Sequence, residues 1–336
     1  MNLSDILDFY KSSQTDELIN KADEVCRTVY GDKVFLRGLI EFSNYCDKDC
    51  LYCGIRNSNT TVHRYRLTEN EIIQTVKEGF KSGLKTFVLQ SGEDDWYSQK
   101  KLCYIIDEIK KVTDNEAALT LSCGIKTKSQ YGELKSAGCD RYLIRFETSD
   151  ENLHKYLRGG ISLKRRLQAL DDLKSLDFEV GSGYMVGLPE ETEETRINNA
   201  ILCYNYNFDM VGIGPFIPHP DTPLADTIQQ PIDLAIRATA LIRLLLPKSN
   251  IPATTAAGTL DKDGREKILK SGANVLMPNI TPTVYKKDYL LYPNKICIDE
   301  SGFQCIGCLS GRVKSIDKTL SFERGDSISF LERMKD

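Results

Sequence analysis

The sequence predicts an α/β fold, a complete (β/α)8 barrel of the TIM type with short amino-terminal helices and a carboxyl-terminal extension. Eight short apolar runs of strand length alternate with amphipathic stretches of helical period along the chain. Helical crossovers between successive strands require parallel pairing, and eight parallel strands close a barrel. A doubly wound open sheet is the alternative. Polar residues at the end of almost every apolar run favour the barrel, because those ends would share one mouth.

The elements follow one another without a linker, and we predict one domain over residues 1–336. Residues 1–30 carry apolar side chains at helical spacing, which predicts two short helices before a barrel over 34–282. The predicted strands are 34–42, 85–91, 117–122, 141–147, 179–186, 210–216, 251–256 and 274–278. The predicted helices between them are 68–82, 98–112, 129–137, 163–176, 192–206, 232–246 and 263–271. Residues 283–336 form the extension.

Residues at the helix ends support these boundaries. Thr68 and Glu71 have the spacing of a capping box at the start of the first barrel helix. Gly83, Gly138 and Gly272 each follow a predicted helix, and glycine adopts the left-handed conformation of a helix carboxyl end most easily. Local signals and the long-range pattern therefore agree on where these helices begin and end.

Composition indicates a globular protein of a reducing compartment. The 336 residues are 41% hydrophobic and 27% charged, which is enough apolar material for a large core. The net charge is −4 with acidic and basic residues interleaved, which gives no support for binding nucleic acid or an anionic membrane. No apolar run approaches the roughly 20 residues that span a bilayer, and the amino terminus lacks the pattern of a signal peptide. The chain has eleven cysteines, an odd number, and most of them are clustered or stand alone in apolar runs. This pattern is typical of thiols that stay reduced, as they do in the cytoplasm.

Three cysteines directly after the first predicted strand indicate a metal site. Cys46, Cys50 and Cys53 have the spacing C-x3-C-x2-C, and thiolates are soft ligands for zinc or iron–sulfur clusters. A structural zinc site needs four protein ligands, and the fourth would have to come from a remote residue. A 4Fe-4S cluster held by three thiolates keeps one iron open for a small molecule. The number of thiols favours the cluster.

The three cysteines, with the aromatic Tyr52 before the last, resemble the signature of the radical S-adenosylmethionine (SAM) enzymes. In that superfamily the open iron chelates the amino and carboxylate groups of SAM. One electron from an external low-potential donor then cleaves the sulfonium and yields a 5′-deoxyadenosyl radical. The resemblance implies a 4Fe-4S cluster and SAM as cofactors. This chemistry requires no tight general acid–base pair, because the adenosyl radical supplies the reactivity. The resemblance identifies no catalytic residue that donates a hydrogen atom.

Longer segments resemble a narrower family, the FeFe-hydrogenase maturases of the HydE type, which lies close to biotin synthase and methylornithine synthase. The resemblance covers roughly residues 34–310. The segments that carry it are 37–46, 88–93, 185–189, 211–223, 250–255 and the cysteines from 297 to 308. The whole superfamily shares the cysteine triad. A much narrower group of proteins shares the run at 212–220, which reads Gly-Ile-Gly-Pro-Phe-Ile-Pro-His-Pro. The family fold is a complete barrel with cluster and SAM inside its mouth.

The resemblance implies a set of SAM-binding residues at the strand ends and on one following helix. They are Gln90, Gly92, Glu93, Ser122, Glu147, Arg166 and Met185. Gly92 permits close backbone approach, Glu93 offers an acceptor to a cationic amine, and Arg166 suits a bidentate grip on a carboxylate. Glu93 also has an ordinary alternative role, because it could cap the following helix together with Asp94 and Asp95.

The resemblance also implies an anion-holding substrate pocket. Its members are Thr120, Arg145, Met210, Thr254, Thr255, Tyr285 and Tyr289. Arg145 and Glu147 are two residues apart on one strand and share a face, and charged groups in a barrel lumen must be paired or bind something. An outward-facing pair between barrel and helices is the alternative. Threonine is also common in strands for packing alone.

A second cysteine triad, C-x7-C-x2-C, lies in the carboxyl-terminal extension at Cys297, Cys305 and Cys308. It matches a second iron–sulfur cluster site that some HydE-type maturases carry and others lack. Its position after the eighth strand, beyond Tyr292 and Pro293, predicts a surface site outside the barrel. Free thiols or a zinc site are the alternatives.

The three histidines carry less information. His63 and His154 lie in polar stretches and are expected to be solvated, whereas His219 is expected to shape the loop after the sixth strand. None of the three is predicted to take part in the chemistry.

The family resemblance implies an enzyme that acts on a small molecule, a cysteine-derived iron–carbonyl–cyanide species, during assembly of the FeFe-hydrogenase di-iron cofactor. Its implied partners are the other hydrogenase maturases, one of which cleaves tyrosine. A related radical SAM enzyme, such as the lysine mutase that makes methylornithine, is the first alternative. That enzyme is expected to lack the second triad and to need acidic groups at both ends of its pocket. A non-enzymatic iron–sulfur scaffold is the second alternative, and a scaffold has no use for a SAM site.

Overall fold

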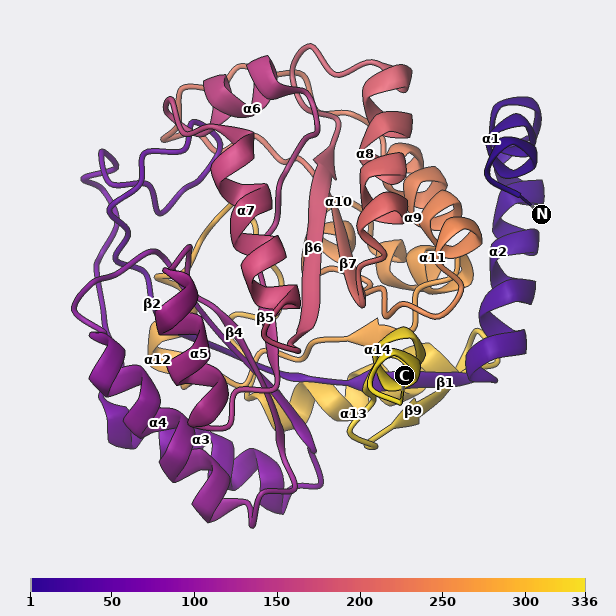
Figure 1. The fold of residues 1–336 in the computed structure, drawn as a ribbon. Helices are drawn as coiled ribbons and strands as arrows, with labels where there is room; N and C mark the ends of the chain where they lie inside the picture. The colour runs from indigo at the N-terminus through magenta and orange to yellow at the C-terminus, as the bar shows by residue number, and fades with distance from the viewer. Residues whose placement is uncertain (1, 336) are drawn as a thin grey trace.

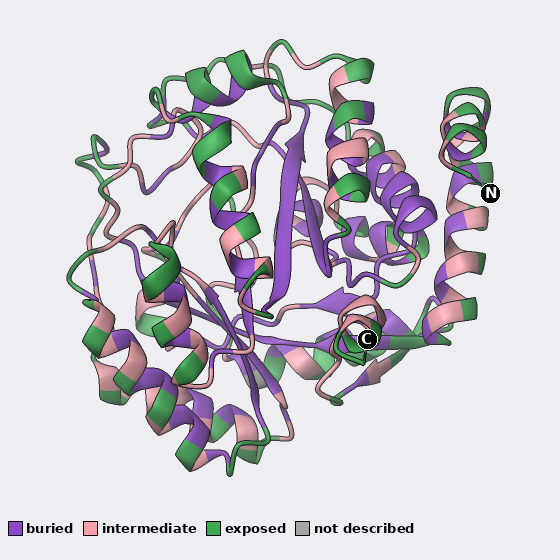
Figure 2. Ribbon diagram, in the orientation of Figure 1, coloured by how far each residue is buried: buried purple, intermediate pink, exposed green. Residues whose placement is uncertain are grey.

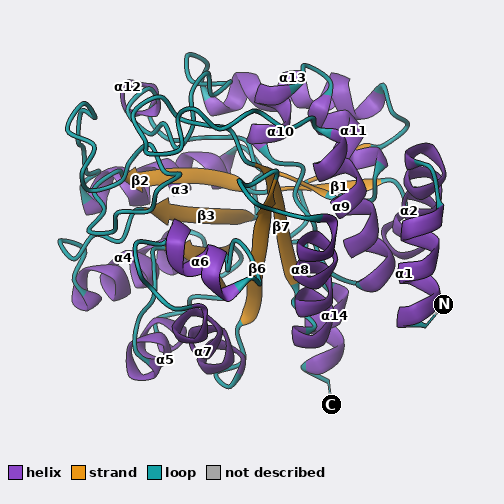
Figure 3. Cartoon of the chain, turned by 90° about the horizontal axis from the view of Figure 1, so that it is seen from above, coloured by secondary structure: helices purple, strands orange, loops and turns teal. Residues whose placement is uncertain are grey.

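The computed structural model describes residues 2–335 and shows a parallel α/β fold whose strands lie inside a layer of helices (Figure 1, Figure 3). Six strands form one parallel sheet in sequential order, from β2 to β7. Their bounds are β2 Gly38–Ser43, β3 Thr86–Ser91, β4 Ala118–Ser122, β5 Arg141–Leu143, β6 Glu179–Val186 and β7 Met210–Pro215. Every residue of β6 and β7 is buried (Figure 2), as expected for parallel strands covered by helices.

Short pairings continue the circle between β7 and β2. β8, Val275–Leu276, pairs with β1, Lys33–Leu36, and the chain runs on from β1 into β2 after a break at Arg37. Single parallel bridges link Met210 with Asn250, Pro252 with Val275, and Leu39 with Asn279. The predicted parallel fold of the barrel type is confirmed, although regular strand pairing is not continuous around the circle.

Four predicted strands differ clearly from the structure. The predicted strand 34–42 is divided into β1 and β2, and the predicted strand 274–278 is reduced to β8. The predicted strand 141–147 pairs regularly only over β5, although the N–H groups of Ile144 and Phe146 still donate to carbonyls of β6. The left-handed φ of 66° at Glu147 then ends the extended chain.

The predicted strand 251–256 is replaced by two bridges and by α10, Thr255–Leu260. Thr254 is the N-cap of α10 and accepts a hydrogen bond from a backbone N–H of its first turn. This hydrogen bond stabilises the start of a helix at Thr255 in place of the predicted strand.

The predicted barrel helices are present. They are α3 Glu69–Lys81, α4 Gln99–Val112, α5 Lys128–Ser136, α7 Leu163–Lys174, α8 Glu193–Tyr206, α9 Asp233–Leu245 and α11 Gly264–Lys270. Thr68 and Glu71 form the predicted capping box on α3. The sequence analysis misses α13, Gly302–Lys314, and several short elements: α6 Glu151–Leu157, α12 Thr283–Lys286, β9 Thr319–Ser321 and α14 Ile328–Arg333. None of the helices within residues 2–335 combines the length and apolar character needed to cross a membrane.

The two predicted amino-terminal helices are α1, Leu3–Ser12, and α2, Thr15–Tyr30. Both pack against α9 at one side of the barrel (Figure 1). Arg237 of α9 donates a hydrogen bond to the Tyr10 carbonyl at 2.7 Å, which holds the end of α1. These helices cover α9 and lie away from the strand ends that carry the polar residues.

The segment 324–333 packs across the amino ends of the strands. Arg141 at the start of β5 and Glu179 at the start of β6 form a fully buried ion pair, with 2.5 Å between Nε and Oε2. The Arg141 guanidinium also donates to the Arg324 carbonyl at 3.0 Å and to the Asp326 carboxylate at 2.5 Å. These contacts close the lower end of the barrel, and its open face is at the carboxyl ends of the strands.

Candidate active site

A large cavity opens at the carboxyl ends of the strands and contains about 320 Å³ of free space. It is lined by the residues that the sequence predicts for the first cluster and for SAM: Cys46, Cys50, Cys53, Gln90, Gly92, Glu93, Ser122, Glu147, Arg166 and Met185. Four residues predicted for the substrate line it as well: Arg145, Thr254, Thr255 and Tyr289. Residues far apart in the sequence thus share one space, as expected where parallel strand ends meet.

The first three cysteines lie on an irregular loop that follows β2 and packs tightly against its neighbours. The Glu93 N–H points at the Cys46 sulfur, with 3.4 Å between nitrogen and sulfur. A Cβ on Gly92 would lie 2.1 Å from the Tyr45 carbonyl oxygen, so only glycine fits beside this loop. A Cβ on Gly54 would lie 2.1 Å from a carbonyl oxygen of the carboxyl-terminal extension. The loop is therefore held on both sides.

The three thiols on this loop are free, and Cys50 is buried whereas Cys46 and Cys53 are partly buried. Burial raises the pKa of Cys46, Cys50 and Cys53. At Cys50 the guanidinium groups of Arg158 and Arg166 oppose this effect, but burial outweighs them and the pKa of Cys50 stays above its ordinary value. Positive charge in the cavity, whether from arginine or from a bound metal, therefore favours the thiolate form that binds iron.

Two buried arginines converge on one carboxylate in the cavity wall. Glu93 Oε1 lies 3.4 Å from Nη2 of Arg158 and 3.7 Å from Nη2 of Arg166. Arg158 also donates to the Tyr52 hydroxyl at 3.0 Å, and Arg166 donates to the Arg145 carbonyl at 3.2 Å. Burial and the nearby charge of Arg158 lower the pKa of Arg166. The sequence analysis misses Arg158, because no local pattern places the end of α6 beside the cysteine loop.

Arg145 and Glu147 both line the cavity, which excludes an outward-facing pair. Arg145 Nη2 and Glu147 Oε2 are 3.0 Å apart, but neither atom makes a hydrogen bond of good geometry within the described residues. Nε of Arg145, and both Nε and Nη2 of Arg166, are buried without a partner in the same part of the chain. An unsatisfied buried polar atom costs about 1–3 kcal/mol, so this wall suits a charged, polar ligand.

Known proteins resemble this chain over most of its length. The model of the Radical SAM superfamily matches residues 40–201. The [FeFe] hydrogenase maturase subunit HydE of Thermotoga maritima is 46% identical over 303 residues, which are 90% of this chain and 86% of that protein. The chain belongs to the HydE family of radical SAM proteins.

Methylornithine synthase is a more distant relative of this HydE-family chain. The 3-methylornithine synthase of Methanosarcina acetivorans is 27% identical over 277 residues, which are 82% of this chain and 77% of that protein. The crystal structure of methylornithine synthase (PylB) superposes with a TM-score of 0.82 at 25% identity, over 95% of this chain and 93% of that chain. The barrel architecture is thus common to both groups.

Membership of the radical SAM superfamily implies a 4Fe-4S cluster and SAM, and the cavity fits both. The sulfurs of Cys46, Cys50 and Cys53 do not all lie within 4.8 Å of one another. Three thiolates on one zinc ion, each at about 2.3 Å, would be about 4 Å apart. The cysteine loop therefore does not form a compact site for a single ion, and the unpartnered atoms of Arg145, Glu147 and Arg166 suit the charged end of SAM.

Three residues predicted for the substrate pocket do not line the cavity of this HydE-family protein. The Thr120 hydroxyl is buried and has no hydrogen-bond partner among the described residues. The Met210 sulfur lies 2.6 Å from Nη1 of Arg37. The Tyr285 hydroxyl donates to Glu71 of α3 at 2.9 Å, which holds the ring outside the cavity. Their part in substrate binding stays a prediction.

Part of the carboxyl-terminal extension lies over the mouth, and this part includes Tyr289, which the sequence predicts for the substrate pocket. Tyr289 and Tyr292 line the cavity, and the Tyr289 hydroxyl accepts a hydrogen bond from Gln90 at 3.3 Å. Lys295 then reaches back to Glu41 of β2 in a buried ion pair of 2.5 Å. The sequence analysis misses Lys295, because its partner is 254 residues away along the chain.

The second triad is only partly assembled. The sulfurs of Cys297 and Cys305 and a carboxylate oxygen of Glu300 lie within 4.8 Å of one another. A hydrogen bond with the Cys305 thiol and the charge of Arg265 lower the pKa of Cys297. Cys308, one turn further along α13, is exposed and lies outside this group. Cys305 is buried and Cys297 is partly buried, and the predicted surface site outside the barrel stays a prediction.

The prediction that His154 is solvated is wrong. Its side chain is fully buried behind the cavity wall, and Nδ1 lies 2.7 Å from the Phe146 carbonyl oxygen. Burial lowers the pKa of His154 to about 4. His219 lies against Gly54 of the cysteine loop, so it shapes that loop as well as its own.

Proposed function

We propose that this protein is a HydE-type maturase, a radical SAM enzyme that acts on a small precursor during assembly of the FeFe-hydrogenase di-iron cofactor. One observation carries the proposal. A single cavity combines three free cysteines with Glu93 and Arg166, in a chain that is 46% identical to a HydE maturase. The 86% coverage of that maturase supports a shared activity for the whole chain.

The first triad is the proposed site of the cluster. Cys46, Cys50 and Cys53 would bind three of its irons and leave the fourth free for SAM. When bound, the cluster and SAM supply a 5′-deoxyadenosyl radical through one-electron cleavage of the sulfonium, with the electron coming from an external low-potential donor. The tight fit of Gly92 and Gly54 against the loop would hold the three sulfurs in place during this chemistry.

Charged side chains in the cavity wall are proposed to bind SAM. Glu93 would accept hydrogen bonds from the ammonium group, and Arg166 would donate to the carboxylate through nitrogens that are otherwise unpartnered. Gln90, Ser122, Glu147 and Met185 complete the proposed set. The Glu93 carboxylate lies near both Arg158 and Arg166, so one negative charge is shared between two cations.

A niche beside Gly214 is the proposed place for an anionic substrate. A Cβ on Gly214 would lie 3.8 Å from both Arg145 Nη1 and Thr254 Oγ1, so the missing side chain leaves room between these two donors. A cationic donor and a hydroxyl suit the carboxylate of a cysteine-derived iron–carbonyl–cyanide species. Tyr289 and Tyr292 cover the mouth and would keep water from a reactive radical.

Methylornithine synthase activity is the alternative, favoured by the TM-score of 0.82. A lysine substrate carries two ammonium groups and one carboxylate, so its pocket needs carboxylates for each ammonium group. The acidic residues in the described cavity lining are Glu93 and Glu147, and the proposed SAM site uses both. The chain also has the second cysteine triad. An iron–sulfur scaffold explains neither Arg166 nor the niche at Gly214.

The test begins with reconstitution of the cluster under anaerobic conditions. Protein reduced with dithionite should convert SAM to 5′-deoxyadenosine, and Cys50→Ala should not, because two thiolates cannot hold the cluster. The second step adds the partner maturases and apo-hydrogenase and measures hydrogen evolution, with free lysine as the competing substrate. SAM cleavage without maturation, together with conversion of lysine, would assign the chain to the alternative. Absence of SAM cleavage by the wild type would reject both enzymes.

A further inference from the structure

Arg158 is a buried cation between the cysteine loop and the carboxylate proposed to hold SAM. It follows directly after α6, and 9% of its side chain is exposed. Nη1 donates to the Tyr52 hydroxyl at 3.0 Å, and Nη2 donates to Glu93 Oε1 at 3.4 Å. Tyr52 stands between Cys50 and Cys53 in the sequence. The guanidinium therefore contacts the loop between two of its three sulfurs.

The end of α6 is fastened to the same loop by backbone and apolar contacts. The Leu51 N–H donates to the Leu157 carbonyl at 2.9 Å. Leu153 and Leu157 belong to a buried apolar cluster against which Leu51 and Tyr52 pack. Arg158 thus leaves a fixed point of the backbone, and its guanidinium has little freedom to move away from the loop.

The charge of Arg158 is only partly compensated. Glu93 is shared with Arg166, and in the proposed function it turns its oxygens to the SAM ammonium group. Nε of Arg158 is buried and makes no hydrogen bond within the described chain. Because a guanidinium stays protonated throughout the physiological range, positive charge persists beside the cluster site.

We propose that Arg158 is a positioning residue that raises the reduction potential of the cluster, and this inference rests on the proposed function. Reduction adds one electron from the external donor to a site that is largely removed from water. A cation held nearby stabilises that added charge, and net charge and hydrogen bonds to the sulfurs set cluster potentials. Arg158 also holds Glu93, whose N–H points at the Cys46 sulfur at 3.4 Å.

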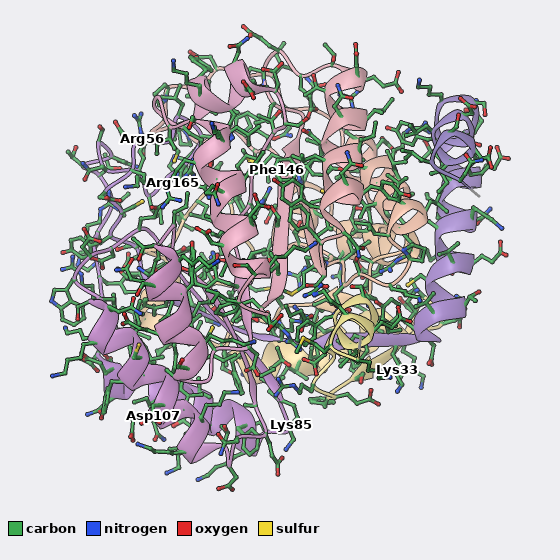
Figure 4. The ribbon with its side chains drawn as sticks, in the orientation of Figure 1. Lys33, Arg56, Lys85, Asp107, Phe146 and Arg165 are labelled. Atoms are coloured by element: carbon green, nitrogen blue, oxygen red, sulfur yellow. The ribbon has the colours of Figure 1, made fainter. Side chains whose placement is uncertain are left out.

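The test compares midpoint potentials of the reconstituted cluster in wild type and variants, by EPR-monitored titration with dithionite. Arg158→Met should shift the potential to more negative values, and Arg158→Lys, which keeps the charge, should recover most of the shift. Arg165→Met removes an exposed guanidinium from the neighbouring helix α7 (Figure 4) and should leave the potential unchanged. A wild-type potential in cluster-loaded R158M would overturn the inference.

Tyr52→Phe separates the charge of Arg158 from its contact with the loop. This variant loses the hydroxyl and keeps the cation, so its potential should stay near that of the wild type. A shift as large as that of R158M would assign the effect to the contact and overturn the inference.

If R158M binds no cluster, its potential cannot be measured, and the iron content after reconstitution is compared among the variants instead. Arg158→Gln then replaces it as the neutral variant. Loss of iron from both neutral variants with retention in R158K supports the need for charge, and loss from all three overturns it. A wild-type protein that binds no cluster contradicts the proposed function instead.

Discussion

Glu41 and Lys295 form a buried ion pair whose charged atoms, Oε1 and Nζ, lie 2.5 Å apart. The pair joins β2 in the barrel wall to the extension that passes over the mouth. Asn279 donates to the second carboxylate oxygen at 2.7 Å, and Lys295 also donates to the Tyr289 carbonyl at 3.0 Å. The position of Tyr289 in the cavity wall therefore depends on a charge pair that is largely removed from solvent.

Lys295→Met should destabilise the protein by about 3–5 kcal/mol, because it leaves the Glu41 carboxylate buried without its cation. Urea denaturation of the apo-protein measures the free energy of unfolding. The matched control is Lys287→Met, which removes an exposed lysine from the same segment and should change that free energy by about 0.5 kcal/mol or less. Equal effects of the two variants would show that the buried pair contributes nothing.

Gly92→Ala should abolish cluster binding. The added Cβ would lie 2.1 Å from the Tyr45 carbonyl oxygen and 2.7 Å from the Cys46 Cβ, so the cysteine loop has to move. Iron content after reconstitution is the measurement. Gly132→Ala in α5 is the control, because nothing lies within 4 Å of its added Cβ, and it should keep full iron and gain about 0.5–1 kcal/mol of stability. Normal iron content in G92A would contradict the tight fit of the loop.

Arg166→Ala should weaken SAM binding to the cluster-loaded protein. Loss of a charge-assisted pair costs about 1.5–3 kcal/mol, which corresponds to about a 10- to 150-fold rise in Kd. Calorimetric titration with SAM measures this Kd. Arg165→Ala, on the exposed face of the same helix, should leave it unchanged. An unaltered Kd in R166A would remove Arg166 from the proposed SAM site.

Stability should fall as the pH is lowered through the range from about 6.5 to 4. His154 has its pKa lowered from 6.5 to about 4 by burial, so the unfolded chain binds more protons than the folded one in this range. The full difference amounts to about 3 kcal/mol. Thermal unfolding of the apo-protein as a function of pH gives the slope. His154→Gln should flatten it, whereas His63→Gln at an exposed position should not, and identical slopes in all three proteins would argue against His154.

The double variant Cys305→Ser with Cys308→Ser should lower iron content while SAM cleavage persists. The argument is positional, because none of the residues proposed to hold SAM belongs to the second triad. The two sites are nevertheless neighbours, since Thr255 and Met277 line both the main cavity and the pocket at Cys297. Iron analysis and 5′-deoxyadenosine formation are measured on the same sample. Retained SAM cleavage with complete loss of maturation would make the second site a relay or a docking point for substrate.

Local patterns predict most of this fold. The alternation of apolar runs with amphipathic stretches is a property of near neighbours, so the strands β2 to β7 and the outer helices follow from it. The seventh predicted strand fails because two local preferences compete. The apolar run through Ile251 favours a strand, while Thr254 can cap a helix, and only the packed structure decides between them.

Long-range partners explain what the sequence analysis misses in the site. The spacing of the first cysteine triad is enough to identify it in the sequence, and the family resemblance identifies Glu93 and Arg166. Arg158 and Lys295 belong to no motif, and their partners Glu93 and Glu41 are 65 and 254 residues away. Their importance comes from burial, and burial is a property of the assembled chain. The same holds for Cys305, whose buried position its place after the eighth strand does not reveal.

The floor of the barrel has a consequence for protein synthesis. Arg141 donates a hydrogen bond to the Arg324 carbonyl, and the ribosome has to add 183 residues after Arg141 before that acceptor exists. Contacts of such sequence separation form late and slow the completion of a fold. The contacts at the amino ends of the strands are therefore completed only after translation has passed residue 326.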